Sequence, residues 1–291
     1  MCDRDQVDGS GAGGVFDWAP NRRQFAVGAM GALAACATNP ASVSTGSLTE
    51  ERVRISTADG TMDAFFVRPA RGRHPAILTW PDVAGLREAF EVMARRLAGQ
   101  GYAVLVVNPY YRAVPAPQFS DFAAFRSQGG FEKVGPWRAA LTADAIRRDA
   151  IAAVAWLDAR REVDTIRGVG THGYCMGGPF TVWTAAAIPG RVRAAASLHG
   201  GGLVKPDDPR SPHNLLKQTQ ASYLFAIAQD DDAKAPEVKT ALRQAAAAAS
   251  RSAEVEVYAA GHGWTVVDSP AYEAAAAEQA WGRMSALFDT L

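Results

Sequence analysis

The sequence predicts an α/β fold in which a doubly wound, mostly parallel sheet carries helices on both faces. Two observations predict it. Short apolar runs alternate along the chain with segments whose apolar residues recur at helical spacing, as Phe90, Met93 and Leu97 do. The run at 102–107 is apolar throughout, which is typical of a strand buried on both faces of a parallel sheet. Strands and helices that alternate in this way form a parallel sheet with right-handed crossovers.

The remaining elements follow in chain order. An opening pair of strands turns at Asp59-Gly60, and the helix that includes Phe90 ends at Gly101, because glycine favours helix ends. Strands are expected at 52–56, 63–67, 76–80, 166–170, 192–198, 222–228 and 254–258. Further helices are expected at 146–157, after Phe180 and at 281–288.

Residues 113–141, called the cap segment below, interrupt this alternation. They are rich in proline, glycine and aromatic residues, and we expect a partly helical cap over the cleft. Its aromatic side chains either shape an apolar pocket or simply pack onto the sheet.

The most informative residue is Cys175. It is the centre of the run Gly-Tyr-Cys-Met-Gly at 173–177, which has the spacing of a nucleophile elbow with cysteine in place of serine. The turn forces its central residue into a strained conformation, and glycines on either side let the backbone pass close by. We therefore expect Cys175 to be a nucleophile. The alternative is a buried structural cysteine, which is the common state of a cysteine taken alone.

An acid and a histidine each follow a predicted strand further along the chain. Asp230 comes after the strand at 222–228, and His262 comes after the strand at 254–258. The carboxyl ends of parallel strands are where such sheets place their ligand sites. We expect His262 to act as the base and Asp230 to orient it, with Asp231 and Asp232 as alternative acids or as caps of a following helix. His199 follows another strand and is the second choice for the base.

These motifs together resemble the dienelactone hydrolase family, within the α/β-hydrolase fold. The resemblance spans roughly residue 50 to the C-terminus and rests on the segments at 80–86, 107–112, 173–178, 228–230 and 260–262. It implies Cys175, Asp230 and His262 as the catalytic triad. It also implies an oxyanion hole formed by the backbone N–H groups of Met176 and Val83.

The resemblance also implies residues that bind the substrate or tune the thiol. Asp82 stands where the family has an acid beside the cysteine, and Arg112 matches an arginine that grips a substrate carboxylate, with Tyr111 beside it. A second family arginine, four residues after the histidine, is replaced here by Val266. That replacement argues against a small dicarboxylate-like lactone as the substrate. His199 and Trp264 are expected to line the pocket, or in the case of Trp264 simply to fill it.

The N-terminal 45 residues predict an export signal and linker, followed by one domain over 46–291. Arg22-Arg23 has the look of a twin-arginine signal, and the apolar run at 26–35 is too short to span a membrane. Cys36 ends a lipobox-like sequence, although an ordinary cleavage site fits as well. We expect an exported protein, periplasmic or anchored to the envelope through a lipid on Cys36. A leader without a signal role is the alternative.

Composition supports an enzyme that acts on a small molecule. Thirty basic and thirty acidic residues balance, so no basic surface indicates nucleic acid. The sequence has no metal-ligand spacing, and we expect neither a metal nor an organic cofactor. The predicted function is hydrolysis of an ester or lactone, with an anionic substrate among the candidates, through an acyl-thioester. The alternatives are a general carboxylesterase without lactone preference and a non-catalytic envelope lipoprotein that binds a ligand.

Overall fold

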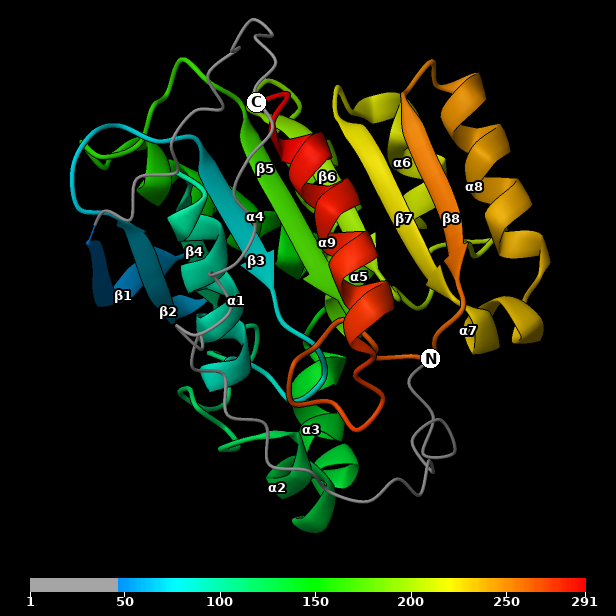
Figure 1. Ribbon diagram of the computed structural model, residues 1–291, viewed down its shortest axis with the longest axis horizontal. Helices are drawn as coiled ribbons and strands as arrows, with labels where there is room; N and C mark the ends of the chain where they lie inside the picture. Colours follow the sequence, from blue (N-terminus) through cyan, green and yellow to red (C-terminus); the bar gives the residue numbers. More distant parts are fainter. Residues whose placement is uncertain (1–46) are drawn as a thin grey trace, which may run out of the picture.

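The computed structural model describes residues 47–291, and these form one sheet with the strand order β1-β2-β4-β3-β5-β6-β7-β8 (Figure 1). β2 pairs antiparallel with β1 and β4, and every other neighbouring pair is parallel. The strands are β1 (Leu48–Thr57), β2 (Gly60–Pro69), β3 (Ala76–Trp80), β4 (Ala103–Val107), β5 (Val169–Tyr174), β6 (Val192–Leu198), β7 (Ser222–Ala228) and β8 (Ala253–Tyr258). The predicted fold class, that of an α/β-hydrolase, is confirmed.

Helices cover both faces of the sheet. Helices α1 and α9 pack on one face, and α4, α5 and α8 pack on the other, so that the sheet lies between two apolar core layers. The helices are α1 (Glu88–Gly99), α2 (Phe122–Ser127), α3 (Gly130–Ala139), α4 (Ala143–Asp158), α5 (Gly178–Ala187), α6 (Pro212–Leu215), α7 (Gln229–Lys234), α8 (Glu237–Ala248) and α9 (Ala274–Phe288), with the short 3₁₀ turns η2 (Cys175–Gly177) and η3 (Leu216–Gln218).

Local chemistry fixes where several helices begin. The hydroxyl of Thr142 accepts the N–H of Ala145 at the start of α4, and the carboxylate of Glu273 accepts two N–H groups at the start of α9. Such caps satisfy backbone donors that the first turn of a helix leaves unpaired. They set the ends of the two helices that pack on opposite faces of the central strands.

One strand boundary differs from the prediction. The strand before the cysteine was expected at 166–170, but β5 begins at Val169 and continues to Tyr174. The side chain of Ile166 is 90% exposed, and its N–H bonds the carboxylate of Asp164. Such an Asx contact favours a turn over a strand. Ile166 therefore belongs to a turn, and the strand lies closer to the elbow than predicted.

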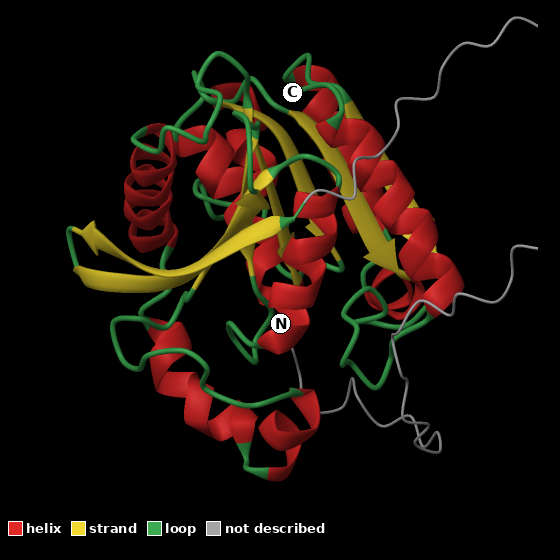
Figure 2. Cartoon of the chain, turned by 60° about the vertical axis from the view of Figure 1, so that its left-hand side comes forward, coloured by secondary structure: helices red, strands yellow, loops and turns green. Residues whose placement is uncertain are grey.

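The cap segment contains two short helices, α2 and α3, beyond the carboxyl ends of β3 and β5 (Figures 1 and 2). Asp121 caps α2, and Gly129, with a φ of 70°, joins α2 to α3. Phe125 is fully buried and makes ring contacts with Phe119, Phe122 and Phe131. These aromatic residues therefore pack on one another within the cap segment, which is neither of the two expectations for them.

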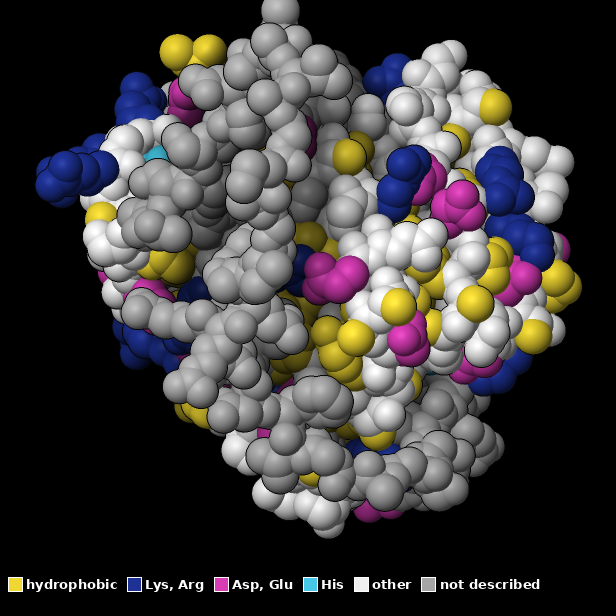
Figure 3. Space-filling model, in the orientation of Figure 1, with side chains coloured by type: hydrophobic (Ala, Val, Ile, Leu, Met, Phe, Trp, Pro, Cys, Tyr) yellow, Lys and Arg dark blue, Asp and Glu magenta, His cyan; other side chains and the backbone are white. Residues whose placement is uncertain are grey.

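Within residues 47–291, no helix has the length and apolar character needed to cross a membrane. On the part of the surface that Figure 3 shows uncovered, basic and acidic side chains are intermixed. The predicted leader, with Arg22, Arg23 and Cys36, lies outside the described residues.

Candidate active site

Cys175 lies at a sharp turn between β5 and α5. Its φ is 51°, a left-handed conformation that is uncommon for a residue other than glycine, and it is 5% exposed. A strained central residue is what the elbow motif predicts. The structure holds Cys175 in a disulfide, so any chemistry of its thiolate requires the reduced protein.

The two flanking glycines permit this turn. A Cβ on Gly173 would lie 2.1 Å from the carbonyl oxygen of Gly177, and a Cβ on Gly177 would lie 2.4 Å from the carbonyl oxygen of Trp80. Both distances are far inside van der Waals contact. Glycine is therefore required on each side, and the elbow packs directly against the end of β3.

His262 follows β8, and three consecutive aspartates at the start of α7 bind three different groups on two residues. Asp231 Oδ2 lies 2.6 Å from Nδ1 of His262, and Asp230 Oδ1 accepts the backbone N–H of His262 at 2.9 Å. Asp232 instead pairs with Lys239 at 2.6 Å. The predicted choice of Asp230 as the acid on the ring is therefore corrected to Asp231. Because α7 begins at Gln229, its first turn presents the second aspartate to the ring and the first to the backbone.

His199 joins the elbow to the histidine loop, residues 261–273. Its Nδ1 accepts the backbone N–H of Cys175 at 3.1 Å, and its Nε2 lies 2.9 Å from the hydroxyl of Thr265. A backbone N–H can only donate, so Nδ1 carries the lone pair and Nε2 carries the proton. Burial, with the neighbouring charge of His262, holds the pKa of His199 well below its ordinary value. The ring of His199 is therefore neutral, and both of its nitrogens are hydrogen-bonded.

The contacts of His199 correct its expected role and bring His262 near the elbow. With Nδ1 and Nε2 both engaged and only 1% exposure, His199 is neither a base nor an open pocket wall. Its ring packs edge-on against the ring of His262, with centroids 4.9 Å apart. The ring of Trp264 packs against its other neighbours, 5.3 Å from His199 and 5.2 Å from Tyr258, and is fully buried. Trp264 therefore fills space behind the site.

The two expected oxyanion donors are held together by Tyr110. The Tyr110 hydroxyl donates to the carbonyl oxygen of Val83 at 2.8 Å and lies 3.3 Å from Sδ of Met176. Met176 is in the one-turn helix η2, whose first N–H groups have no acceptor within the turn. Both residues are buried beside the nucleophile. Tyr110 lies within the motif at 107–112, but the sequence gives it no role, because its partners are distant in the chain.

Asp82 does not have the contacts expected of an acid that tunes the thiol. Its Oδ1 accepts from Arg87 Nη1 at 2.7 Å and from the N–H of Ala84 at 2.9 Å, and its Oδ2 accepts from Arg87 Nη2 at 2.9 Å. Arg87 also bonds Asp268, in the histidine loop. Sequence reasoning missed Arg87 and Asp268 because nothing local to either residue indicates that they meet across 181 positions.

Arg112 and Tyr111 belong to a separate ionic network. Both guanidinium Nη atoms of Arg112 bond the carboxylate of Asp149 at 2.8 Å, and Nη2 also bonds Asp59 at 2.6 Å. Tyr111 donates to Asp149 at 2.7 Å. Asp149, on α4, is 1% exposed, and such a buried carboxylate needs compensating donors. The expected roles of Arg112 and Tyr111 in substrate binding are therefore corrected to compensation of Asp149.

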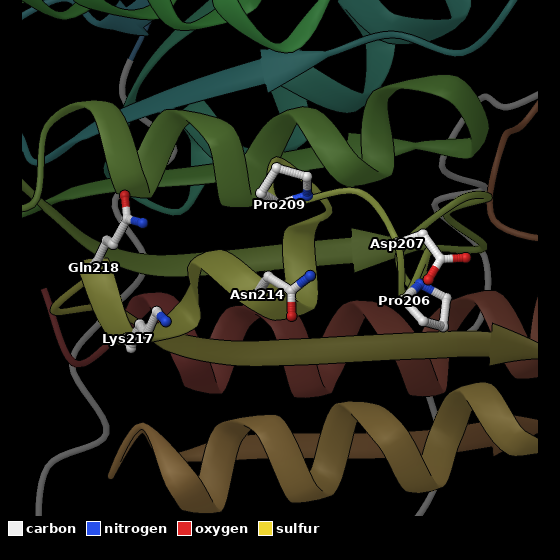
Figure 4. Close-up of a pocket in the computed structure, with 6 residues that line it drawn as sticks. All are labelled: Pro206, Asp207, Pro209, Asn214, Lys217 and Gln218. Atoms are coloured by element: carbon white, nitrogen blue, oxygen red, sulfur yellow. The ribbon is translucent and has the colours of Figure 1, made fainter.

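A surface hollow of about 440 Å³ lies elsewhere, along the segment after β6 (Figure 4). It is lined by Pro206, Asp207, Pro209, Asn214, Lys217 and Gln218. None of these residues contributes to the elbow or to the histidine loop, so this hollow is separate from the candidate active site.

The strand order agrees with the comparisons to known proteins. A model of the dienelactone hydrolase family matches residues 62–291. The chain belongs to the dienelactone hydrolase family. The resemblance inferred from the sequence motifs is thereby confirmed, and the chain is a hydrolase.

Several relatives and solved structures of the dienelactone hydrolase family and its fold resemble this member. The "Putative carboxymethylenebutenolidase" of Escherichia coli is 28% identical over 235 residues, which cover 79% of this chain and 83% of the relative. A structure named as a dienelactone hydrolase from Klebsiella pneumoniae superposes with a TM-score of 0.71 at 24% identity, covering 84% of this chain and 100% of the other. A dienelactone hydrolase-like promiscuous phosphotriesterase from metagenomic libraries gives a TM-score of 0.66 at 25% identity, covering 84% and 98%.

Proposed function

We propose that this protein hydrolyses a carboxylic ester or lactone through Cys175, His262 and Asp231. The observation that carries the proposal is the 2.6 Å contact between the ring of His262 and Asp231, on a histidine that packs against the elbow through His199. A carboxylate on Nδ1 keeps the proton there and leaves Nε2 as the base. This arrangement suits the removal of a proton from a nucleophile.

The reaction proceeds in two halves. With the disulfide reduced, His262 takes the proton of the Cys175 thiol, and the thiolate attacks the substrate carbonyl to form a tetrahedral oxyanion. We assign the stabilisation of that charge to the N–H groups of Val83 and Met176. The C–O bond then breaks, and His262 returns its proton to the leaving alkoxide, which leaves an acyl-thioester on Cys175. Water gives a proton to His262 and attacks the thioester, which releases the carboxylic acid and the thiolate.

Ester and lactone bonds suit this nucleophile better than amides. A thiolate leaves a tetrahedral intermediate more readily than the anion of an amide nitrogen, so attack on an amide would mostly reverse. The name of the Escherichia coli relative refers to a butenolide, which is a lactone, and supports that part of the proposal. A general carboxylesterase is the competing enzyme, and a ligand-binding protein without turnover is the competing non-enzyme.

The test is hydrolysis of a matched panel of p-nitrophenyl esters and enol lactones by the protein reduced with a phosphine. Cys175→Ala and His262→Ala are each expected to lower kcat/KM by about 10³-fold or more. Intact mass under single turnover should show an acyl adduct on the wild-type protein that is absent from Cys175→Ala. Full turnover by Cys175→Ala would remove the nucleophile. Equal rates on esters and lactones would favour the general esterase, and no turnover would favour a binding protein.

We further propose that the protein is exported by the twin-arginine route and that its N-terminus is processed near Cys36. The support is the sequence Asn-Arg-Arg-Gln-Phe at 21–25 followed by an uncharged, small-residue run. Fractionation of cells that express the full chain should place it outside the cytoplasm. Replacing Arg22 and Arg23 with lysine should retain it inside, and the intact mass should distinguish lipid on Cys36 from simple cleavage.

A further inference from the structure

Arg87 is a cation that the mechanism above does not use. It immediately precedes α1 and is 0% exposed. All five of its N–H groups are engaged: with both oxygens of Asp82, with both oxygens of Asp268 and with the carbonyl of Gly85, at distances between 2.7 and 3.1 Å. A buried guanidinium with every donor satisfied on two carboxylates is geometrically rigid.

The first carboxylate belongs to the segment that carries an oxyanion donor. Asp82 directly precedes Val83, and besides Arg87 it accepts the N–H of Ala84, while its carbonyl accepts the N–H of Gly85. Residues 82–87, the oxyanion loop, are thus folded around the Asp82–Arg87 pair. The position of the Val83 N–H follows from that fold.

The second carboxylate belongs to the histidine loop. Asp268 lies six residues after His262, and the intervening backbone is a series of turns in which Trp264 bonds Gly261 and Val266 bonds Gly263. His262 is fixed at one end of this loop by Asp230 and Asp231. Arg87 fixes the middle of the loop, at Asp268.

The carboxylate of Asp268 also binds the cap segment. Oδ2 of Asp268 accepts the N–H of Phe122, the first residue of α2, at 3.0 Å. The guanidinium lies between two rings, 5.0 Å from that of Phe90 and 5.6 Å from that of Phe122. One side chain therefore touches the oxyanion loop, the histidine loop and the start of α2 in the cap segment.

We infer that Arg87 is a positioning residue for the hydrolase, which holds the oxyanion donor of Val83 and the base His262 at catalytic spacing and gives α2 a fixed docking point. This inference rests on the proposed function. Arg87 itself is out of reach of a substrate, because it has no exposed surface. Its effect acts through Asp82 and Asp268.

The chain supplies a matched control. Arg112 also lies between two aspartates, one of them buried, but its partners Asp59 and Asp149 belong to neither active-site loop. Arg87→Met and Arg112→Met each remove a guanidinium and leave carboxylates uncompensated, so both should destabilise the fold. Only the first should disturb catalysis.

The experiment measures kcat and KM on a p-nitrophenyl ester, together with hydrogen exchange, for reduced and folded variants. Arg87→Met should lower kcat by about 10²-fold, the effect of losing one oxyanion donor, while KM changes by less than about threefold. Arg87→Lys keeps the charge but cannot form the two bidentate pairs with Asp82 and Asp268. Its kcat should therefore be about tenfold higher than that of Arg87→Met. Arg112→Met should leave kcat within about threefold of the wild type.

A second variant covers the case in which Arg87→Met does not fold. Asp268→Asn keeps the Asp82–Arg87 pair and should lower kcat by about tenfold or more while protecting the fold. If kcat is unchanged in the folded variant, or if Arg112→Met loses as much as Arg87→Met, the inference is overturned.

Hydrogen exchange separates this inference from the proposed function. Arg87→Met should speed exchange in 82–86, in 261–273 and at the start of α2 together, whereas Arg112→Met should not. If the wild type shows no turnover that depends on Cys175, the proposed function fails, and only hydrogen exchange tests the positioning role of Arg87. If turnover exists but these three segments do not respond together, the positioning role of Arg87 is refuted and the proposed function stands.

Discussion

Nδ1 of His262 lies 2.6 Å from Oδ2 of Asp231, and the carboxylate one residue earlier binds the backbone of the same histidine. Two adjacent acids thus fix one histidine in different ways. Asp231 determines which ring nitrogen of His262 holds the proton, and Asp230 fixes the position of the His262 backbone. Asp232 takes no part, because it pairs with Lys239.

Asparagine replacements along this run should therefore separate the three roles. Asp231→Asn should lower kcat by about 10²- to 10⁴-fold, because an amide does not hold His262 in the required tautomer. Asp230→Asn should have a smaller effect, since its amide oxygen can still accept the N–H of His262. Asp232→Asn is the control and should leave kcat unchanged. Steady-state kinetics on an activated ester gives the ranking, and an equal loss for Asp230→Asn and Asp231→Asn would contradict it.

The adjacent tyrosines Tyr110 and Tyr111 offer a second matched pair. Tyr110→Phe removes the hydroxyl that contacts Val83 and Met176, and we expect kcat to fall by about tenfold with KM little changed. Tyr111→Phe removes the bond to Asp149 and should cost about 1–3 kcal/mol of unfolding free energy without changing kcat. Thermal unfolding and steady-state kinetics of both variants check this, and a larger kcat loss for Tyr111→Phe would refute the assignment.

Buried neutral histidines predict how stability depends on acid. Burial lowers the pKa of His172 to about 3 and also lowers that of His199, whereas an unfolded histidine titrates near 6.5. As pH falls below 6.5, the unfolded state binds these protons first. The stabilisation is therefore complete above pH 6.5 and is lost as pH falls toward the folded-state pKa.

The expected result is a fall of about 1.4 kcal/mol in unfolding free energy per pH unit for each such histidine below pH 6. His172→Gln should lose stability at pH 7, because its bonds to Thr79 and Tyr174 change, yet show a shallower slope between pH 6 and 4. Urea unfolding at a series of pH values measures both quantities. An unchanged slope would mean that His172 is protonated in the folded state.

Sequence periodicity predicted most of the fold because burial and strand alternation are local signals. The opening strand pair turns at the predicted position, Asp59-Gly60, and the apolar run at 102–107 becomes the fully buried strand β4. The shifted start of β5 is an exception with a local cause, the turn that Asp164 makes with Ile166. Strand ends then brought Cys175 and His262 to the same edge of the sheet.

The partners of charged groups were the part that the sequence did not reveal. The sequence suggested that Arg112 was available to bind a substrate, but it is bound to Asp149, 37 residues later. Asp82 is likewise paired with Arg87, which also bonds Asp268. Choosing among three adjacent aspartates required the rotation of α7, which no local pattern specifies. Contacts between distant charges depend on the packed structure, whereas the positions of strand ends do not.

The last prediction concerns the charge of the substrate. Arg112 and Arg87 are both held by aspartates, and the next candidate cation is Arg138, on α3 of the cap segment. Burial raises the pKa of Tyr110, and the charge of Arg138 opposes that rise. Trp137, next to Arg138, packs on Tyr110 with ring centroids 5.5 Å apart. Arg138 is half-buried and forms no salt bridge within residues 47–291.

We therefore expect Arg138 to favour an ester whose acyl chain ends in a carboxylate. The p-nitrophenyl monoester of glutaric acid and p-nitrophenyl pentanoate are similar in length and differ in charge. Arg138→Gln should raise KM for the glutarate ester by about tenfold and leave the pentanoate ester within about threefold. Arg112→Gln is the control and should leave KM unchanged for both esters. The wild-type preference should also weaken as salt is added, because a half-exposed charge is screened. Equal effects of Arg138→Gln on both esters would show that this arginine does not select substrate charge.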